Sequence, residues 1–139
     1  MNCPHCGRAN LKKKPRARIR GEYKGEEFTV TMEGLACQKC GFATVDGPRM
    51  AEYMRLVADA YRSRHGLLTS QEIRERRRRL GLSQAEFAKH LGVGVASVKR
   101  WEMGLVQDVS SNELLRLRTD VGTARQNLEQ IQELVSTER

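Results

Sequence analysis

The stretch that decides the fold is Leu82–Gly104, which reads LSQAEFAKHLGVGVASVKRWEMG. Ser83 and Glu86 form a capping box, which signals that a helix begins there. Gly92 stands where that helix should end, and a second short helix follows. Apolar residues lie where two such helices would face each other, at Phe87, Ala88, Leu91, Val98 and Trp101. The pattern predicts a helix-turn-helix, with the two helices packed near a right angle.

The outward side of the second helix carries residues suited to DNA. Arg100 can donate two hydrogen bonds to guanine, the commonest specific contact in the major groove. Ser97 and Lys99 suit phosphates or base edges, and Gln84 suits the DNA backbone beside the groove. The predicted DNA-binding residues are Gln84, Ala96, Ser97, Lys99 and Arg100.

A helix is also predicted directly upstream. Thr69 and Glu72 form another capping box, and Gly81 stands where that helix should end. The helix-turn-helix domain is therefore expected over 69–120. The upstream helix contains the run Arg76–Arg79, which is either a solvated helix face or a contact to phosphate.

Two CxxCG knuckles punctuate the N-terminal part, at 3–7 and 37–41. Zinc binds four ligands in a tetrahedron and favours thiolates, so two knuckles complete its coordination and leave no position open for water. A redox role is the alternative, but redox CxxC motifs rarely come in matched pairs. We expect one structural zinc ion per chain, with His5 outside the ligand set. The predicted ligands are Cys3, Cys6, Cys37 and Cys40.

The chain between the knuckles reads as a β-hairpin. Apolar and polar residues alternate over 16–20 and 27–32, with Gly21 and Gly25 between these runs. The period becomes helical after Pro48. We therefore expect a zinc-binding β domain over 1–47 and a linking helix within 48–68, and an α+β fold for the whole chain.

The tail has apolar residues at spacings of three and four, at Leu114, Leu117, Val121, Ala124, Leu128, Ile131 and Val135. About three heptads of this kind favour a coiled coil. The competing interpretation gives Leu114 and Leu117 to the core of the helix-turn-helix domain. We expect Leu114 and Leu117 to serve the domain core, and residues 121–139 to form a C-terminal helix that joins two copies into a homodimer.

Charge and composition narrow the classes of function. The net charge is +8, with +4 from nine basic and five acidic residues over 1–47, and +4 from eight basic and four acidic residues over 69–104. A basic chain of this kind favours nucleic acid as a partner. The sequence shows no signal-peptide pattern and no apolar run approaching a membrane span, so we expect a cytoplasmic protein without membrane contact.

Together these motifs resemble known families. Residues 70–120 look like the Xre-type helix-turn-helix of lambdoid phage repressors, and the whole chain resembles the MqsA antitoxin family, which joins a YgiT-type zinc finger to such a domain. The resemblance implies an N-terminal domain that binds zinc and a toxin, and a C-terminal domain that dimerises and binds a palindromic operator. It also implies that the four cysteines bind zinc and that Arg100 reads a base.

The chain departs from that family at three points. Ala96 replaces an asparagine, so one adenine contact is expected to be absent and the operator to differ. Gly94 stands where many Xre-type domains have a serine cap, and the N-terminal strands are unusually basic.

Several functions remain to be separated. The leading one is an antitoxin of a type II toxin–antitoxin pair that represses its own operon. The alternatives are a stand-alone Xre-type regulator, from a phage or mobile element, and an RNA-binding ribbon protein. An enzyme is not expected, because the sequence offers no open metal site, no clustered carboxylates and no nucleophile beside a base.

Overall fold

The computed structural model describes residues 1–137, which fall into two compact units with the division between Gly66 and Leu67. The described chain contains one three-stranded antiparallel sheet and six α-helices, so the predicted α+β class is confirmed. None of these helices has the length and apolar character needed to cross a membrane.

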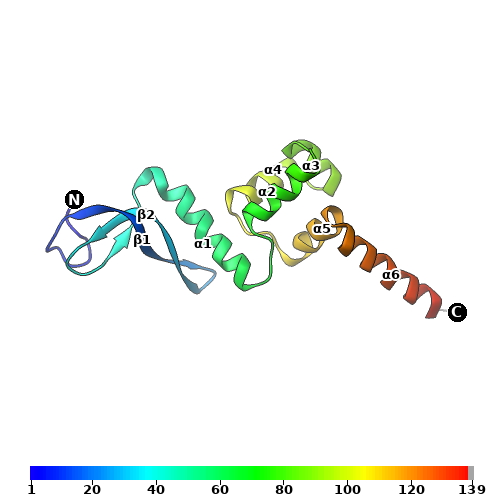
Figure 1. Cartoon of the computed structure of the whole chain (residues 1–139), viewed down its shortest axis with the longest axis horizontal. Coiled ribbons are helices and arrows are strands. Elements are labelled where there is room, and N and C mark those ends of the chain that lie inside the picture. The colour runs from blue at the N-terminus through cyan, green and yellow to red at the C-terminus, as the bar shows by residue number, and fades with distance from the viewer. Residues whose placement is uncertain (138–139) are drawn as a thin grey trace. The chain divides into compact units, whose positions relative to one another are not determined.

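The first unit is built on a long β-hairpin (Figure 1). Strand β1 (Leu11–Tyr23) pairs with β2 (Glu26–Cys37), and the short β3 (Ala43–Thr44) adds to the far side of β2. The chain reverses at Lys24 and Gly25, which both have positive φ, as tight hairpin turns require. Gly21, which the sequence placed between the strands, lies inside β1 opposite Phe28.

Helix α1 (Met50–Arg64) covers one face of this hairpin, after a single 3-10 turn (Gly47–Arg49). The alternation in the strands gives the sheet an apolar inner face, formed by Ala17, Ile19, Phe28, Val30 and Met32. Val57 of α1 packs on that face. Residues 48–68 were expected to hold a linking helix. The structure places α1 within the first unit, because its apolar stripe is buried against the sheet.

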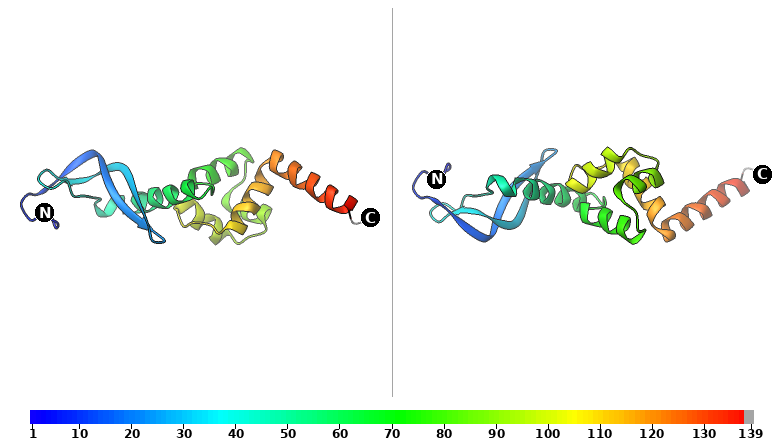
Figure 2. Two further views of the ribbon diagram at one scale, coloured as in Figure 1. Left: turned by 90° about the horizontal axis from the view of Figure 1, so that it is seen from below. Right: turned by 90° about the horizontal axis from the view of Figure 1, so that it is seen from above.

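The second unit begins with four short helices, seen from two further sides in Figure 2. They are α2 (Ser70–Arg79), α3 (Gln84–Leu91), α4 (Val95–Met103) and α5 (Val109–Thr119). Both predicted capping boxes are present, at Thr69 and Ser83. The helices share one core, formed by Leu68, Ile73, Phe87, Ala88, Leu91, Val98, Trp101 and Leu115.

The tail consists of two helices rather than one. Helix α6 (Val121–Thr137) starts after Asp120, whose extended backbone (φ −125°, ψ 116°) ends α5. The Asp120 carboxylate accepts a hydrogen bond of 3.0 Å from the Thr123 N–H and so caps α6. On α5 the buried leucine is Leu115, while Leu114 is partly buried and Leu117 does not belong to the core cluster. The heptad spacing therefore describes α6 and fails across Asp120.

Candidate metal centre and nucleic-acid interface

The four cysteines come together at one end of the hairpin. Their sulfur atoms all lie within 4.8 Å of one another. Cys3 and Cys40 are 3.6 Å apart through Sγ, and Cys6 and Cys37 are 3.7 Å apart. A tetrahedron of four Zn–S bonds of about 2.3 Å needs sulfur separations of about 3.8 Å. The cluster therefore has the dimensions and the donor set that a zinc ion requires.

Each knuckle is a tight turn closed by its own backbone. The Gly7 N–H donates to the Cys3 carbonyl at 2.9 Å, and the Gly41 N–H donates to the Cys37 carbonyl at 3.0 Å. Both glycines have positive φ, at 67° and 78°, which explains why glycine follows each CxxC. Because Cys37 is the last residue of β2, the hairpin itself carries the second knuckle to the first.

A backbone donor favours the thiolate form of one of the four cysteines, Cys37. The Cys40 N–H lowers the pKa of the Cys37 thiol to about 6, against the opposing effect of burial. A lowered pKa favours the thiolate, which is the form that binds metals. Four thiolates at this separation repel one another unless a cation lies between them. The four sulfurs can therefore complete the coordination of one metal ion, which leaves no coordination position open for a catalytic water or substrate.

His5 lies beside this cluster but is not one of its members. Its ring stacks on Phe42, with centroids 6.0 Å apart and planes 7° from parallel. The two rings help to line an open hollow of about 470 Å³, together with Arg18 and Arg20 of β1. The sequence predicts that His5 is a solvated residue of the turn, and in the structure its side chain is exposed.

The predicted DNA-reading stretch forms α3, a turn over 92–94, and α4. Gly92 ends α3 in the left-handed region, with φ 78° and ψ 29°. Gly94 is the N-cap of α4 and supplies no side chain to cap it. Val98 and Trp101 are buried against α3, so the inward face predicted for α4 is confirmed.

The five predicted DNA-binding residues differ in their exposure to solvent. Ala96, Lys99 and Arg100 are exposed on α4, whereas Ser97 and Gln84 are half-buried. Arg100 Nη2 lies 3.5 Å from the Ser97 Oγ, so these two side chains meet on the outer surface. Gln84 begins α3, on the neighbouring helix.

Two further side chains on α4 are exposed and do not belong to the five predicted DNA-binding residues; the sequence already predicts the outward face for one of them, Met103. Val95 is 39% exposed and Met103 is 73% exposed, although both are apolar. Helical periodicity places Met103 away from the inward face of Val98 and Trp101, whereas Val95, three residues before Val98, lies beside that face. The exposure of Val95 was not predicted, because periodicity alone places it next to the buried Val98.

The arginine run divides between two roles. Arg77 pairs with the buried Glu102 of α4, and Arg76 donates to the Thr119 hydroxyl at 3.0 Å. Arg78 and Arg79 are exposed. The interpretation of the run as a purely solvated face is therefore wrong for Arg76 and Arg77. The sequence could not reveal this, because their partners lie 43 and 25 residues away, respectively.

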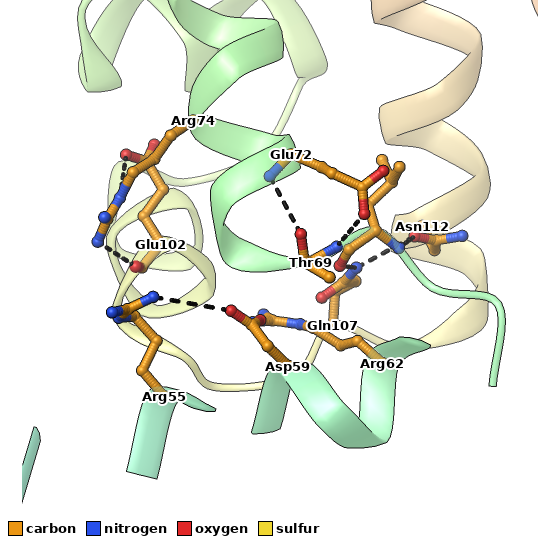
Figure 3. A network of polar contacts seen from close by, with 10 residues as sticks. Arg55, Asp59, Arg62, Thr69, Glu72, Arg74, Glu102, Gln107 and Asn112 are labelled. Atoms are coloured by element: carbon orange, nitrogen blue, oxygen red, sulfur yellow. Dashed lines mark hydrogen bonds and ion pairs between the residues drawn. The ribbon is translucent and has the colours of Figure 1, made fainter. Parts of the chain in front are cut away.

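A polar network fixes the ends of the helices in the second unit (Figure 3). Arg74 donates to the Glu102 carbonyl at 2.5 Å, at the end of α4. The buried Gln107 side chain donates to the Leu68 carbonyl at 2.9 Å and to the Asn112 side chain at 3.1 Å. The Asn112 oxygen also accepts from the Leu68 N–H at 2.9 Å. The loops before α2 and after α4 are thereby tied to α5.

Comparison with known proteins gives one family. The model of the family described as the antitoxin component of bacterial toxin–antitoxin system, MqsA, matches residues 1–130. That match spans the cysteine cluster, all of α1–α5 and residues 121–130 of α6. A search of curated proteins finds no match.

Proposed function

Because the chain belongs to the MqsA family of antitoxins, we propose that it is the antitoxin of a type II toxin–antitoxin pair and a sequence-specific repressor of its own operon. The observation that carries the DNA-binding part is the outer face of α4. It presents Lys99 and Arg100 to solvent while Val98 and Trp101 hold the helix on α3. A helix anchored in this way can enter the major groove.

Arg100 is the residue proposed to read a base, through guanine O6 and N7. Replacing Arg100 by alanine should cost about 1–3 kcal/mol of operator binding per half-site. Binding to random duplex at low salt should fall much less, because phosphate contacts remain. The matched control is Arg78→Ala, which removes an exposed arginine from α2 and should weaken all duplexes alike.

Fluorescence anisotropy with operator and scrambled duplexes measures both affinities. An unchanged operator-to-scrambled ratio for Arg100→Ala would show that α4 is not the reading helix. Failure of the wild-type chain to prefer any duplex would remove the repressor function altogether.

A palindromic operator requires two copies of the chain, and we assign their contact to α6. Val121, Leu128, Ile131 and Val135 are all between 48% and 71% exposed, at heptad spacings. In a monomer this face would leave a row of large apolar side chains in water. A pair of α6 helices removes it from water and sets two α4 helices on successive half-sites.

For the toxin, we propose the outer face of the β1–β2 hairpin as the binding surface. The first unit carries thirteen basic and seven acidic residues over 1–66, a net charge of +6. Arg18 and Arg20 stand on its outer face opposite Thr31 and Thr29, and neither has an ion-pair partner within residues 1–137. A toxin with an acidic surface fits this face.

Charge reversal at Arg18 and Arg20 tests this surface. The double substitution to glutamate should weaken toxin binding in titration calorimetry and leave operator binding unchanged. If toxin affinity survives the reversal, the toxin binds elsewhere on the chain.

If the neighbouring genes encode no toxin, the second candidate, a stand-alone regulator of the same architecture, replaces the antitoxin. Either regulator acts in the cytoplasm, where thiols stay reduced.

A further inference from the structure

We propose that Val95 and Ala96, in the first turn of α4, read thymine through its methyl group. This inference rests on the proposed function, because it needs α4 in the major groove. Beyond the proposed function, Val95 and Ala96 become specificity-determining residues, and thymine becomes the base that they select.

The apolar side chains of Val95 and Ala96 lie outside the core of the second unit. The core of the second unit takes Val98 and Trp101 from α4, and Val95 and Ala96 do not belong to it. Val95 is 39% exposed, and Ala96 is exposed as well. Val95 directly follows the N-cap, where a β-branched residue is not a favoured helix former. Neither the core of the second unit nor helix propensity requires a valine at this position.

The start of α4 offers no side-chain hydrogen-bonding group at its N-cap or at its first two residues. Gly94 supplies no side chain, and Val95 and Ala96 have neither donor nor acceptor. The N-terminal residues of a recognition helix are the ones that contact base edges. Among the major-groove edges of the four bases, only thymine offers an apolar group, its C5 methyl. The first turn of α4 can therefore recognise thymine and cannot hydrogen-bond to any base through these side chains.

The position of Arg100 on the same helix predicts how far the selected thymine lies from the guanine that Arg100 is proposed to read. Arg100 lies four residues beyond Ala96, which is about 6 Å along the helix axis at 1.5 Å per residue. Successive base pairs lie about 3.4 Å apart. The selected thymine should therefore lie within about two base pairs of the guanine that Arg100 reads.

The test uses the full-length dimer and a duplex that the protein itself selects from a random library. Each thymine of one half-site is replaced in turn by deoxyuridine, which removes the methyl group and leaves every hydrogen-bonding group in place. One buried methyl contributes about 0.8 kcal/mol, so the proposal expects a loss of about fourfold in affinity at one or two thymines. All other thymines should tolerate uracil.

Two variants assign the methyl to its reader. In Val95→Ala the uracil penalty should shrink toward one at the thymine that Val95 contacts, because the variant no longer reaches the methyl group. Val95→Thr keeps the shape of valine and one of its methyl groups, so it should retain at least part of the penalty. Val109→Ala is the matched control, because Val109 is an exposed valine that directly follows the N-cap of α5, and it should leave the penalty unchanged.

The outcomes separate the two levels of the argument. If uracil is tolerated everywhere while Arg100→Ala still abolishes sequence preference, the proposal is wrong and the DNA-reading role of α4 stands. A penalty that persists in full in Val95→Ala, at every sensitive thymine, would also overturn it for Val95. If the library yields no preferred duplex, the proposed repressor function and this inference fail together.

Discussion

Arg77 of α2 binds the carboxylate of Glu102 of α4 with two hydrogen bonds, Nε to Oε2 at 2.8 Å and Nη2 to Oε1 at 2.9 Å. Glu102 is only 2% exposed, and its interaction raises the pKa of the Arg77 guanidinium. Arg74 Nε lies 3.7 Å from the same carboxylate. The helix proposed to read DNA is therefore held at its C-terminal end by a buried ion pair, in addition to its apolar contacts.

Removing one partner of this pair should destabilise the second unit. Arg77→Gln leaves the Glu102 carboxylate buried without its main partner, and we expect a loss of roughly 3 kcal/mol in the free energy of unfolding. Urea unfolding followed by the fluorescence of Trp101, the one tryptophan of the chain, measures it. Arg78→Gln is the matched control, because Arg78 is exposed, and should change stability by less than about 0.5 kcal/mol. Equal stability of the two variants would contradict a structural role for the pair.

The cysteine cluster should bind one zinc ion per chain. Removal of the zinc ion by a chelator should unfold the knuckles and the hairpin, because the four sulfurs join the two ends of residues 1–47. NMR spectra would show collapsed dispersion for residues 1–47, while Trp101 fluorescence stays native.

Two substitutions separate ligands from neighbours. Cys40→Ser should lower the zinc content measured by atomic absorption, whereas His5→Ala should keep it at one ion per chain. A metal-free protein with a native hairpin spectrum would refute the structural metal.

Gly21 is expected to be intolerant of a side chain. A Cβ at this position would lie 2.6 Å from Val57 Cγ2 and 2.7 Å from the Tyr53 hydroxyl oxygen, which donates to the Arg20 carbonyl. Gly21→Ala should push α1 off the sheet and cost about 1–3 kcal/mol. Native-state hydrogen exchange of β1 and β2 in the zinc-loaded protein reports this loss. Gly47→Ala is the control, since a Cβ there meets nothing within 4 Å. Identical exchange rates in both variants would show that α1 does not pack this closely.

The face of α6 should decide the oligomeric state. If the proposed dimer forms through α6, truncation after Thr119 removes its contact and should give a monomer in sedimentation velocity, with a corresponding loss of operator affinity. Leu128→Glu should do the same within the full chain, because it places a charge on the proposed contact face. Gln130→Glu adds the same charge at an exposed position outside the heptad seam and should leave the dimer intact. A truncated chain that still sediments as a dimer would place the contact within residues 1–119 and contradict the assignment to α6.

Local signals in the sequence predicted the parts of the fold that depend on neighbouring residues. Each capping box, at Thr69 and Ser83, involves side chain and backbone groups three residues apart, so the pattern alone determines it. The same holds for the knuckle turns, where the cysteine spacing and the following glycine are sufficient. The inward positions of Val98 and Trp101 follow from helical periodicity. The four metal-ligating candidates needed no knowledge of the fold.

Tertiary structure alone decided what depends on distant partners. The pairing of Arg77 with Glu102, the packing of α1 on the sheet beside Gly21, and the choice of Leu115 for the core all join segments that the sequence does not mark as neighbours. Asp120 ends a heptad pattern that continues through it in the sequence, because its carboxylate caps a new helix. Spacing fixes which residues share a face of one helix, whereas only the packed chain fixes what that face meets.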